Sequence, residues 1–167
     1  MANNSKVIYK SGTINKFSTT TKGQQKKFIT QMNDLEKQMI FIAVKNFNLN
    51  KMIISPHLKE KMLEKGITFG VDLIKKTIKE FTIEKNLLEC NYNADGSTRI
   101  LIKSHDTFKV EMENEIKECV ICFVINLKNH HLATVYWNTV EFSKRIPNLK
   151  NYNRRLDILT HLKPYIN

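Results

Sequence analysis

Residues Cys119–Asn138 read CVICFVINLKNHHLATVYWN and contain the densest apolar run of the chain. The first part, up to Ile125, is apolar at both parities, which is typical of a strand that is covered on both faces. A polar break at residues 126–131 follows, and Leu127 is its only large apolar residue. The second part alternates, with one parity made of Leu132, Thr134, Tyr136 and Asn138. The sequence therefore predicts a central β-hairpin with one apolar face and one face carrying hydroxyl and amide groups.

Two short helices are predicted before this hairpin. Ser55 can cap a helix that has Pro56 at its first position, and Gly66 follows the last helical residues. A second helix is expected over roughly residues 71–81, because apolar residues there recur at spacings of three and four. The pair should form a tight helical hairpin.

A longer amphipathic helix is predicted from about Lys22 to Phe47, where apolar residues recur at the same spacing. Its apolar side can dock on the domain or form a homodimer contact. Residues 1–20 are rich in Asn, Ser, Thr and Lys, and we interpret them as an arm with a short strand near Tyr9.

The remaining elements define the fold class. Strands are predicted at residues 87–92, 98–104 and 108–112, with an acidic turn at 111–118 before the hairpin and a C-terminal helix near residues 151–162. Helices that are segregated from a meander indicate an α+β fold. We therefore predict N-terminal helices on one face of an antiparallel meander of about four strands, followed by a C-terminal helix.

Charge is distributed unevenly along the 167 residues, whose net charge is +11. Residues 1–53 carry nine basic and two acidic side chains, so the excess is mostly N-terminal. We predict two parts, a basic extension at residues 1–53 and a compact domain at residues 54–167. A basic balance favours an anionic partner such as nucleic acid, although a Lys-rich solubilising surface gives the same total. No signal peptide or membrane span is recognised, so a cytoplasmic protein is expected.

The three cysteines, Cys90, Cys119 and Cys122, lie in apolar strands, which favours buried thiols in a reducing compartment. The CxxC pair is a weak zinc signal, because residues three apart on a strand face opposite sides. Motifs for nucleotide-dependent enzymes, serine hydrolases and zinc proteases are absent from the sequence. We predict no metal and no cofactor.

The polar sheet face is the first candidate for chemistry. Cleavage of RNA by its own 2′-hydroxyl needs a base, an acid and cations that stabilise the phosphorane. The parity of the strands gives this face a set of suitable side chains, namely Arg99, Lys103, His105, Thr134, Tyr136 and Asn138. Such residues are also ordinary on the exposed face of a half-buried sheet. His57, at a helix start that disfavours the imidazolium form, is a second candidate base or a plain surface residue.

Several segments resemble a class of small phage- and plasmid-encoded domains. They are SPHLKEKMLEKGI at residues 55–67, RILIK at 99–103, CVICFV at 119–124 and TVYWN at 134–138, in the same order. The class is akin to RelE- and BrnT-like toxins, within the barnase–colicin–RelE group of metal-free ribonucleases. The class has arginines where Lys61 and Lys65 stand here. The resemblance covers about residues 54–153 and leaves the N-terminal extension unexplained.

The resemblance implies a toxin-like, metal-independent endoribonuclease or an RNA-binding relative, acting in the host cytoplasm if phage-encoded. Its catalytic positions fall on His57, Arg99, Lys103, Tyr136 and Asn138. In this hypothesis Arg99 and Lys103 hold the phosphate, and His57 or Tyr136 moves protons. Additional RNA contacts are predicted at Lys26, Lys27, Arg154 and Arg155. The alternative is a non-enzymatic phage protein that binds and inhibits a host or defence protein.

Overall fold

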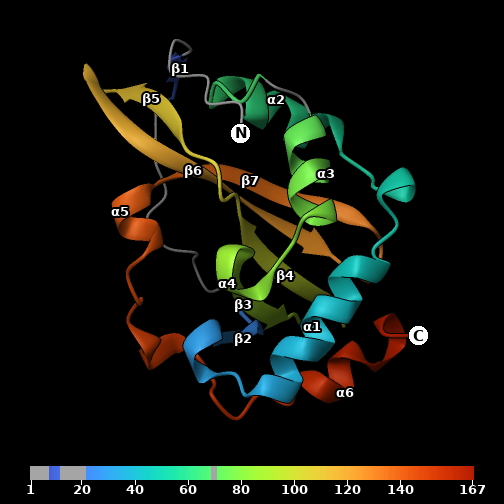
Figure 1. The fold of residues 1–167 in the computed structure, drawn as a ribbon. Helices are drawn as coiled ribbons and strands as arrows, with labels where there is room; N and C mark the ends of the chain where they lie inside the picture. Colours follow the sequence, from blue (N-terminus) through green and yellow to red (C-terminus); the bar gives the residue numbers. More distant parts are fainter. Residues whose placement is uncertain (1–7, 12–21, 69–70) are drawn as a thin grey trace.

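The computed structural model describes residues 8–11, 22–68 and 71–167, and its fold is α+β (Figure 1). Within these residues one sheet has seven strands: β1 (Ile8–Lys10), β2 (Gln25–Phe28), β3 (Leu87–Tyr92), β4 (Thr98–Lys103), β5 (Phe108–Met112), β6 (Glu115–Asn126) and β7 (His131–Thr139). The helices are α1 (Asp34–Asn46), α2 (Pro56–Glu64), α3 (Asp72–Lys79), α4 (Ile83–Asn86), α5 (Val140–Ser143) and α6 (Ile158–Leu162). Short 3-10 turns lie at Ile29–Gln31, Leu49–Lys51, Leu149–Asn151 and Lys163–Tyr165. The predicted α+β class and C-terminal helix are confirmed. The rest of the predicted arm at residues 1–20 lies outside the described residues.

The long strand β6 organises the sheet. Its first part pairs with β5 and its last part with β4, while β7 pairs along its other edge. The sheet continues from β4 through β3 to β2, and from β5 to β1. The predicted four-stranded antiparallel meander is therefore only a rough match, since β1 and β2 extend the sheet and β1 pairs with β5 in parallel. Strand β6 also begins earlier than predicted, because the turn before it is tight and has positive φ at Glu113 and Asn114.

One face of the sheet, the core face, packs against the helices. It contributes Ile100, Ile121 and Trp137 to the main core, together with residues of α1, α2, α3 and α6. The opposite face, the second face, carries a smaller apolar cluster of Leu101, Val120, Cys122, Val124 and Tyr136, on which Val140 of α5 packs. Leu132 belongs to the main core rather than to the parity of Tyr136, because the β6–β7 register shifts between Val124 and Ile125. The predicted alternation of β7 is thus interrupted by a bulge.

Local signals explain the helix starts. The Ser55 hydroxyl accepts a hydrogen bond from the Leu58 N–H at 3.1 Å, and Pro56 opens α2. Gly66 has a φ of +71°, the left-handed conformation that follows many helices. The structure confirms both short helices predicted before the strands. At the end of α2 the Trp137 indole N–H donates to the Lys65 carbonyl at 2.7 Å, which ties this helix to β7.

The predicted helix Lys22–Phe47 is wrong in its first part. Residues 25–28 form β2, which pairs antiparallel with β3, and α1 begins only after Asn33. The Asn33 side chain accepts from the Glu36 N–H, and Glu36 accepts from the Asn33 N–H, so this capping box starts the helix there. Residues 25–46 consequently belong to the same sheet and core as the later residues.

The C-terminal helix is also shorter than predicted. It spans Ile158–Leu162 and starts after Asp157, whose carboxylate accepts from the Thr160 N–H at 3.2 Å. Residues 152–157 cross the molecule without helical structure. This segment and α5 lie near the second face, which is consequently less open than the sequence predicted.

Candidate functional site

Four of the predicted catalytic residues share the second face. Lys103 pairs with Cys122, which in turn pairs with Tyr136, so these three side chains lie in one row across the sheet. Arg99 lies on the same face, four residues before Lys103 and about 13 Å along the strand. Asn138, two residues after Tyr136, also points to this face. The parity of β4, β6 and β7 brings these residues together.

Arg99 and Lys103 differ in their surroundings. The Arg99 guanidinium donates to the Ser97 hydroxyl at 3.2 Å and contacts the Asp95 carboxylate at 3.4 Å. Lys103 is half-buried, and burial lowers the pKa of its ammonium from the ordinary value; nearby Lys144 acts in the same direction. Both cations are thus placed at the margins of the apolar cluster, with Leu101 between them on the strand.

Tyr136 and Asn138 lie beneath α5 and the segment that follows it. They line a small pocket of about 30 Å³ together with Phe142, Arg145 and Tyr152. Tyr136 is only 6% exposed, and burial raises the pKa of its phenol far above the ordinary value. The phenol therefore stays protonated at neutral pH, so it can donate a proton or a hydrogen bond but cannot act as a base.

This pocket also contains a buried carboxylate, which the sequence pattern did not predict as a site residue. Glu89 of β3 is 1% exposed, and its Oε2 accepts a hydrogen bond from the Tyr152 hydroxyl at 2.5 Å. Lys26 lies beside it, with its ammonium 4.4 Å from the centre of the Tyr152 ring. Burial lowers the pKa of Lys26, and the Glu89 charge opposes this effect. The available sequence signal was the single acidic residue of β3.

His57 is not part of this group. It lies at the start of α2, which packs on the core face through Leu58 and Met62, and its side chain is exposed. In the part of the chain that the structure describes, it makes no hydrogen bond or ion pair with the residues of the second face. The resemblance placed His57 in the site, but the structure does not bring it there.

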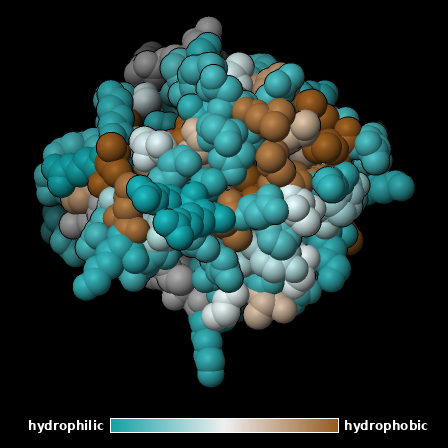
Figure 2. Space-filling view, turned by 90° about the horizontal axis from the view of Figure 1, so that it is seen from below, coloured by the Kyte–Doolittle hydropathy of each residue, from teal (hydrophilic) through white to brown (hydrophobic). Residues whose placement is uncertain are grey.

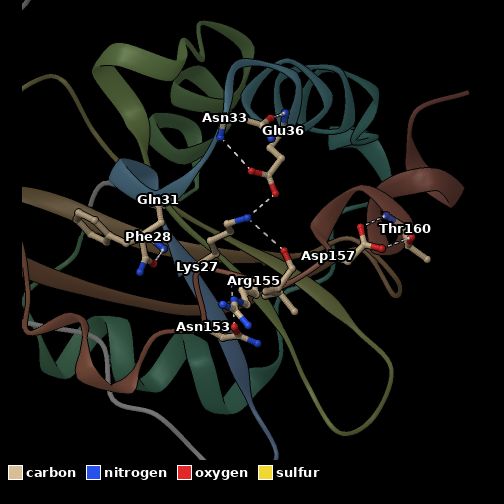
Figure 3. Close-up of polar contacts among 10 residues, drawn as sticks. Lys27, Phe28, Gln31, Asn33, Glu36, Asn153, Arg155, Asp157 and Thr160 are labelled. Carbon is tan, nitrogen blue, oxygen red and sulfur yellow. Dashed lines mark hydrogen bonds and ion pairs between the residues drawn. The ribbon is translucent and has the colours of Figure 1, made fainter.

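The four predicted RNA contacts divide into two pairs. Lys26 lies under Tyr152, and Lys27 is buried on the core face, where its ammonium pairs with Glu36 at 2.6 Å (Figure 3). Neither ammonium is presented to solvent, because strand β2 is enclosed by α1 and the C-terminal segment. Arg154 and Arg155 are exposed in that C-terminal segment.

The segment at residues 144–155 is strongly basic. It has no acidic residue, and its five basic side chains, Lys144, Arg145, Lys150, Arg154 and Arg155, are all exposed. It lies against the second face, because Arg145 and Tyr152 line the pocket there and the Asn153 N–H donates to the Lys26 carbonyl at 2.8 Å. This side of the molecule therefore carries a run of exposed positive charges.

The CxxC cysteines lie on opposite faces of β6. Cys119 belongs to the main core and Cys122 to the cluster of the second face. Burial raises the pKa of both thiols to about 12, so neither is a reactive thiolate at neutral pH. Across residues 8–11, 22–68 and 71–167, no three or more His, Cys, Asp or Glu side chains gather where they could hold a metal ion.

Exposed hydrophobic residues also occur outside the candidate site. The lower side of the molecule is mostly hydrophilic but includes a hydrophobic patch (Figure 2). The solvent side of α1 carries Leu35, which is 48% exposed. The predicted homodimer through this helix stays a prediction. No helix in the described part of the chain is long and apolar enough to cross a membrane.

Comparison with known proteins gives no match to a family model, a curated protein or a solved structure.

Proposed function

We propose that this protein binds RNA on the second face of its sheet and cleaves it without a metal ion. The observation that carries the proposal is the position of Arg99, Lys103 and the Glu89 carboxylate on one sheet face, beside the basic segment at residues 144–155. Cations arranged in this way attract a polyanion, and a buried carboxylate supplies a base.

The chemistry follows from the roles these groups can take. Glu89 accepts the proton of the 2′-hydroxyl, whose oxygen attacks the adjacent phosphorus. Tyr136, which keeps its proton at neutral pH, donates toward the 5′-oxygen as the P–O bond breaks. Arg99 and Lys103, at the two margins of this site, hold the RNA phosphates on either side of it. The products are a 2′,3′-cyclic phosphate and a 5′-hydroxyl. The proton taken up by Glu89 then passes back to the Tyr136 phenolate, which restores both groups.

Access requires movement of the covering segment. The pocket volume of about 30 Å³ holds little more than water, and Tyr152 occupies the Glu89 oxygen. Substrate must displace Tyr152 from Glu89 before the base can act. Because residues 144–155 are basic and have little regular structure, an incoming RNA strand can recruit them as it displaces the tyrosine.

Binding is tested with a fluorescent single-stranded RNA by anisotropy at several salt concentrations. Arg99→Ala is expected to weaken binding and to reduce the slope of log K against log salt by about 0.7, as for one lost phosphate contact. Lys59→Ala, which removes an exposed charge on α2 over the core face, is the matched control and should change the slope less. An unchanged slope in Arg99→Ala would remove this residue from the interface.

Cleavage is tested with total RNA in EDTA. Glu89→Gln keeps an acceptor for Tyr152 and is expected to lower the cleavage rate by about 10² to 10⁴ while RNA binding persists. Binding without cleavage in the wild-type protein would refute the catalytic part and leave an RNA-binding protein. Absence of both binding and cleavage would refute the proposal entirely.

A further inference from the structure

A larger pocket lies away from the second face. It has a volume of about 340 Å³, within the range of small-molecule sites. One wall is α3, with Leu73 and Lys76, followed by Glu80 just after the helix, and the opposite wall is the link between β4 and β5. Lys85 of α4 also lines the cavity.

The pocket lies where the sheet ladder is interrupted between β4 and β5. Strands β4 and β5 both pair with β6, but the residues between them leave the ladder. The Ser104 hydroxyl accepts from the Ile121 N–H at 3.0 Å and donates to the Asp106 carbonyl at 2.8 Å, so side-chain bonds replace part of the missing ladder. These bonds hold the link in a defined shape, and the notch is a built feature of the fold.

Five ionisable side chains line this notch without partners. They are Lys76, Glu80, Lys85, His105 and Asp106, and within the described chain none of their side chains makes a hydrogen bond or an ion pair. By contrast, the neutral polar groups of the lining are satisfied internally. The Asn86 amide donates to the Lys103 carbonyl and the Thr77 hydroxyl donates to the Leu73 carbonyl.

We propose that this pocket binds a ribonucleoside monophosphate. Its phosphate requires several donors in one place, and Lys76, Lys85 and His105 supply them from three different elements. Its ribose hydroxyls require acceptors, and the Glu80 and Asp106 carboxylates supply these in the same cavity. A simple anion would leave the two carboxylates without partners, and a simple cation would leave the ammoniums without partners. A phosphorylated ribose satisfies both sets.

The site does not rest on the function proposed for the second face. Its charged groups come from α3, α4 and the β4–β5 link, and it shares no lining residue with the pocket that contains Glu89 and Tyr152. Nucleotide binding can therefore be measured independently of RNA cleavage.

Isothermal titration calorimetry of the full chain with uridine 5′-monophosphate tests the proposal. Binding is expected, and Lys76→Ala with Lys85→Ala should weaken it by tenfold or more, as expected for lost charged hydrogen bonds (on the order of tenfold each). Lys79→Ala, an exposed lysine of α3 that does not line the pocket, is the matched control and should bind like the wild type. Circular dichroism of each variant shows whether it has folded.

Three comparison ligands test whether the pocket recognises the ribose together with the phosphate. Uridine and inorganic phosphate should each bind at least about tenfold more weakly than the nucleotide, and the 2′-deoxy nucleotide should also bind more weakly, because each lacks groups that the pocket pairs. Equal binding of inorganic phosphate, or no nucleotide binding by the folded wild type, would overturn the proposal. Loss of nucleotide binding in Arg99→Ala would place the ligand on the second face and would overturn it as well.

Discussion

The buried ion pair between β2 and α1 offers the sharpest test of what stabilises this fold. Lys27 Nζ lies 2.6 Å from Glu36 Oε2, and the two side chains are only 7% and 6% exposed (Figure 3). Lys27 also donates to the Leu156 carbonyl at 3.3 Å, and Glu36 accepts from the Asn33 N–H at 2.9 Å. One ion pair thus joins the sheet, the first long helix and the C-terminal segment.

Lys27→Met removes the charge while keeping most of the side-chain volume. At 2.6 Å and an effective dielectric constant of about 20, the lost Coulomb attraction is about 6 kcal/mol. Part of that attraction is offset in the wild type by the cost of desolvating both groups. Removing one partner of a buried pair typically costs about 3 to 5 kcal/mol, because the other charge stays buried and unpaired. That loss is a large share of the roughly 5 to 15 kcal/mol that stabilises a domain.

Urea unfolding followed by the fluorescence of Trp137 measures this loss, since Trp137 is the single tryptophan and is fully buried. The double variant Lys27→Met with Glu36→Gln should be more stable than the sum of the single losses predicts, by about 1 to 3 kcal/mol. Glu141→Gln is the matched control, because its pair with Arg145 is also 2.6 Å long but exposed, and it should cost no more than about 1 kcal/mol. A loss below about 1 kcal/mol in Lys27→Met would refute the reasoning.

Three further substitutions or titrations have defined outcomes. Gly66→Ala should lower the free energy of unfolding by more than about 1 kcal/mol in urea, because φ is positive and a Cβ would collide with the Lys10 carbonyl; a stabilised variant would contradict this. Tyr152→Phe removes the hydrogen bond to Glu89 and should cost about 1.5 to 3 kcal/mol, whereas an unchanged urea midpoint would show that the bond contributes nothing. Burial raises the pKa of the Cys122 thiol from near 9 to about 12, so the contribution of this thiol to stability is complete below pH 9 and falls as pH rises from 9 toward 12. A thiol reagent at pH 8 should therefore label Cys122 only after unfolding. Rapid labelling of the native protein would disprove the burial of this thiol.

Much of the fold could be predicted from interactions between residues that are close together in the sequence. Ser55, Pro56 and Gly66 mark the ends of α2 through capping and backbone conformation, which depend on neighbouring residues only. The hairpin of β6 and β7 was predicted from its alternation and its polar turn for the same reason. The false helix over residues 22–33 has the opposite cause. Its apolar spacing suits a helix, but β3 offers an unpaired edge to residues 25–28, and strand pairing prevails there.

In the candidate site, too, some positions follow from the local sequence and others from tertiary packing. Alternation alone placed Arg99 and Lys103 on one face, because successive side chains of a strand point to opposite sides. The role of Glu89 could not be predicted, since its partner Tyr152 is 63 residues away and only tertiary packing joins them. The separation of His57 from the second face was also decided by packing, because the apolar residues of α2 dock it on the core face.

The sequence by itself determined the ends of α2, the parity of β4 and the inert positions of the paired cysteines, since each depends on residues within a few positions of one another. Tertiary structure alone decided which sheet face is covered, which lysines are buried and where the cavities lie. Those properties arise from segments distant in the chain, such as β2 against β3 and residues 144–155 against the second face. The pattern of residues adjacent in the sequence cannot predict such contacts, because they form only when the whole core is assembled.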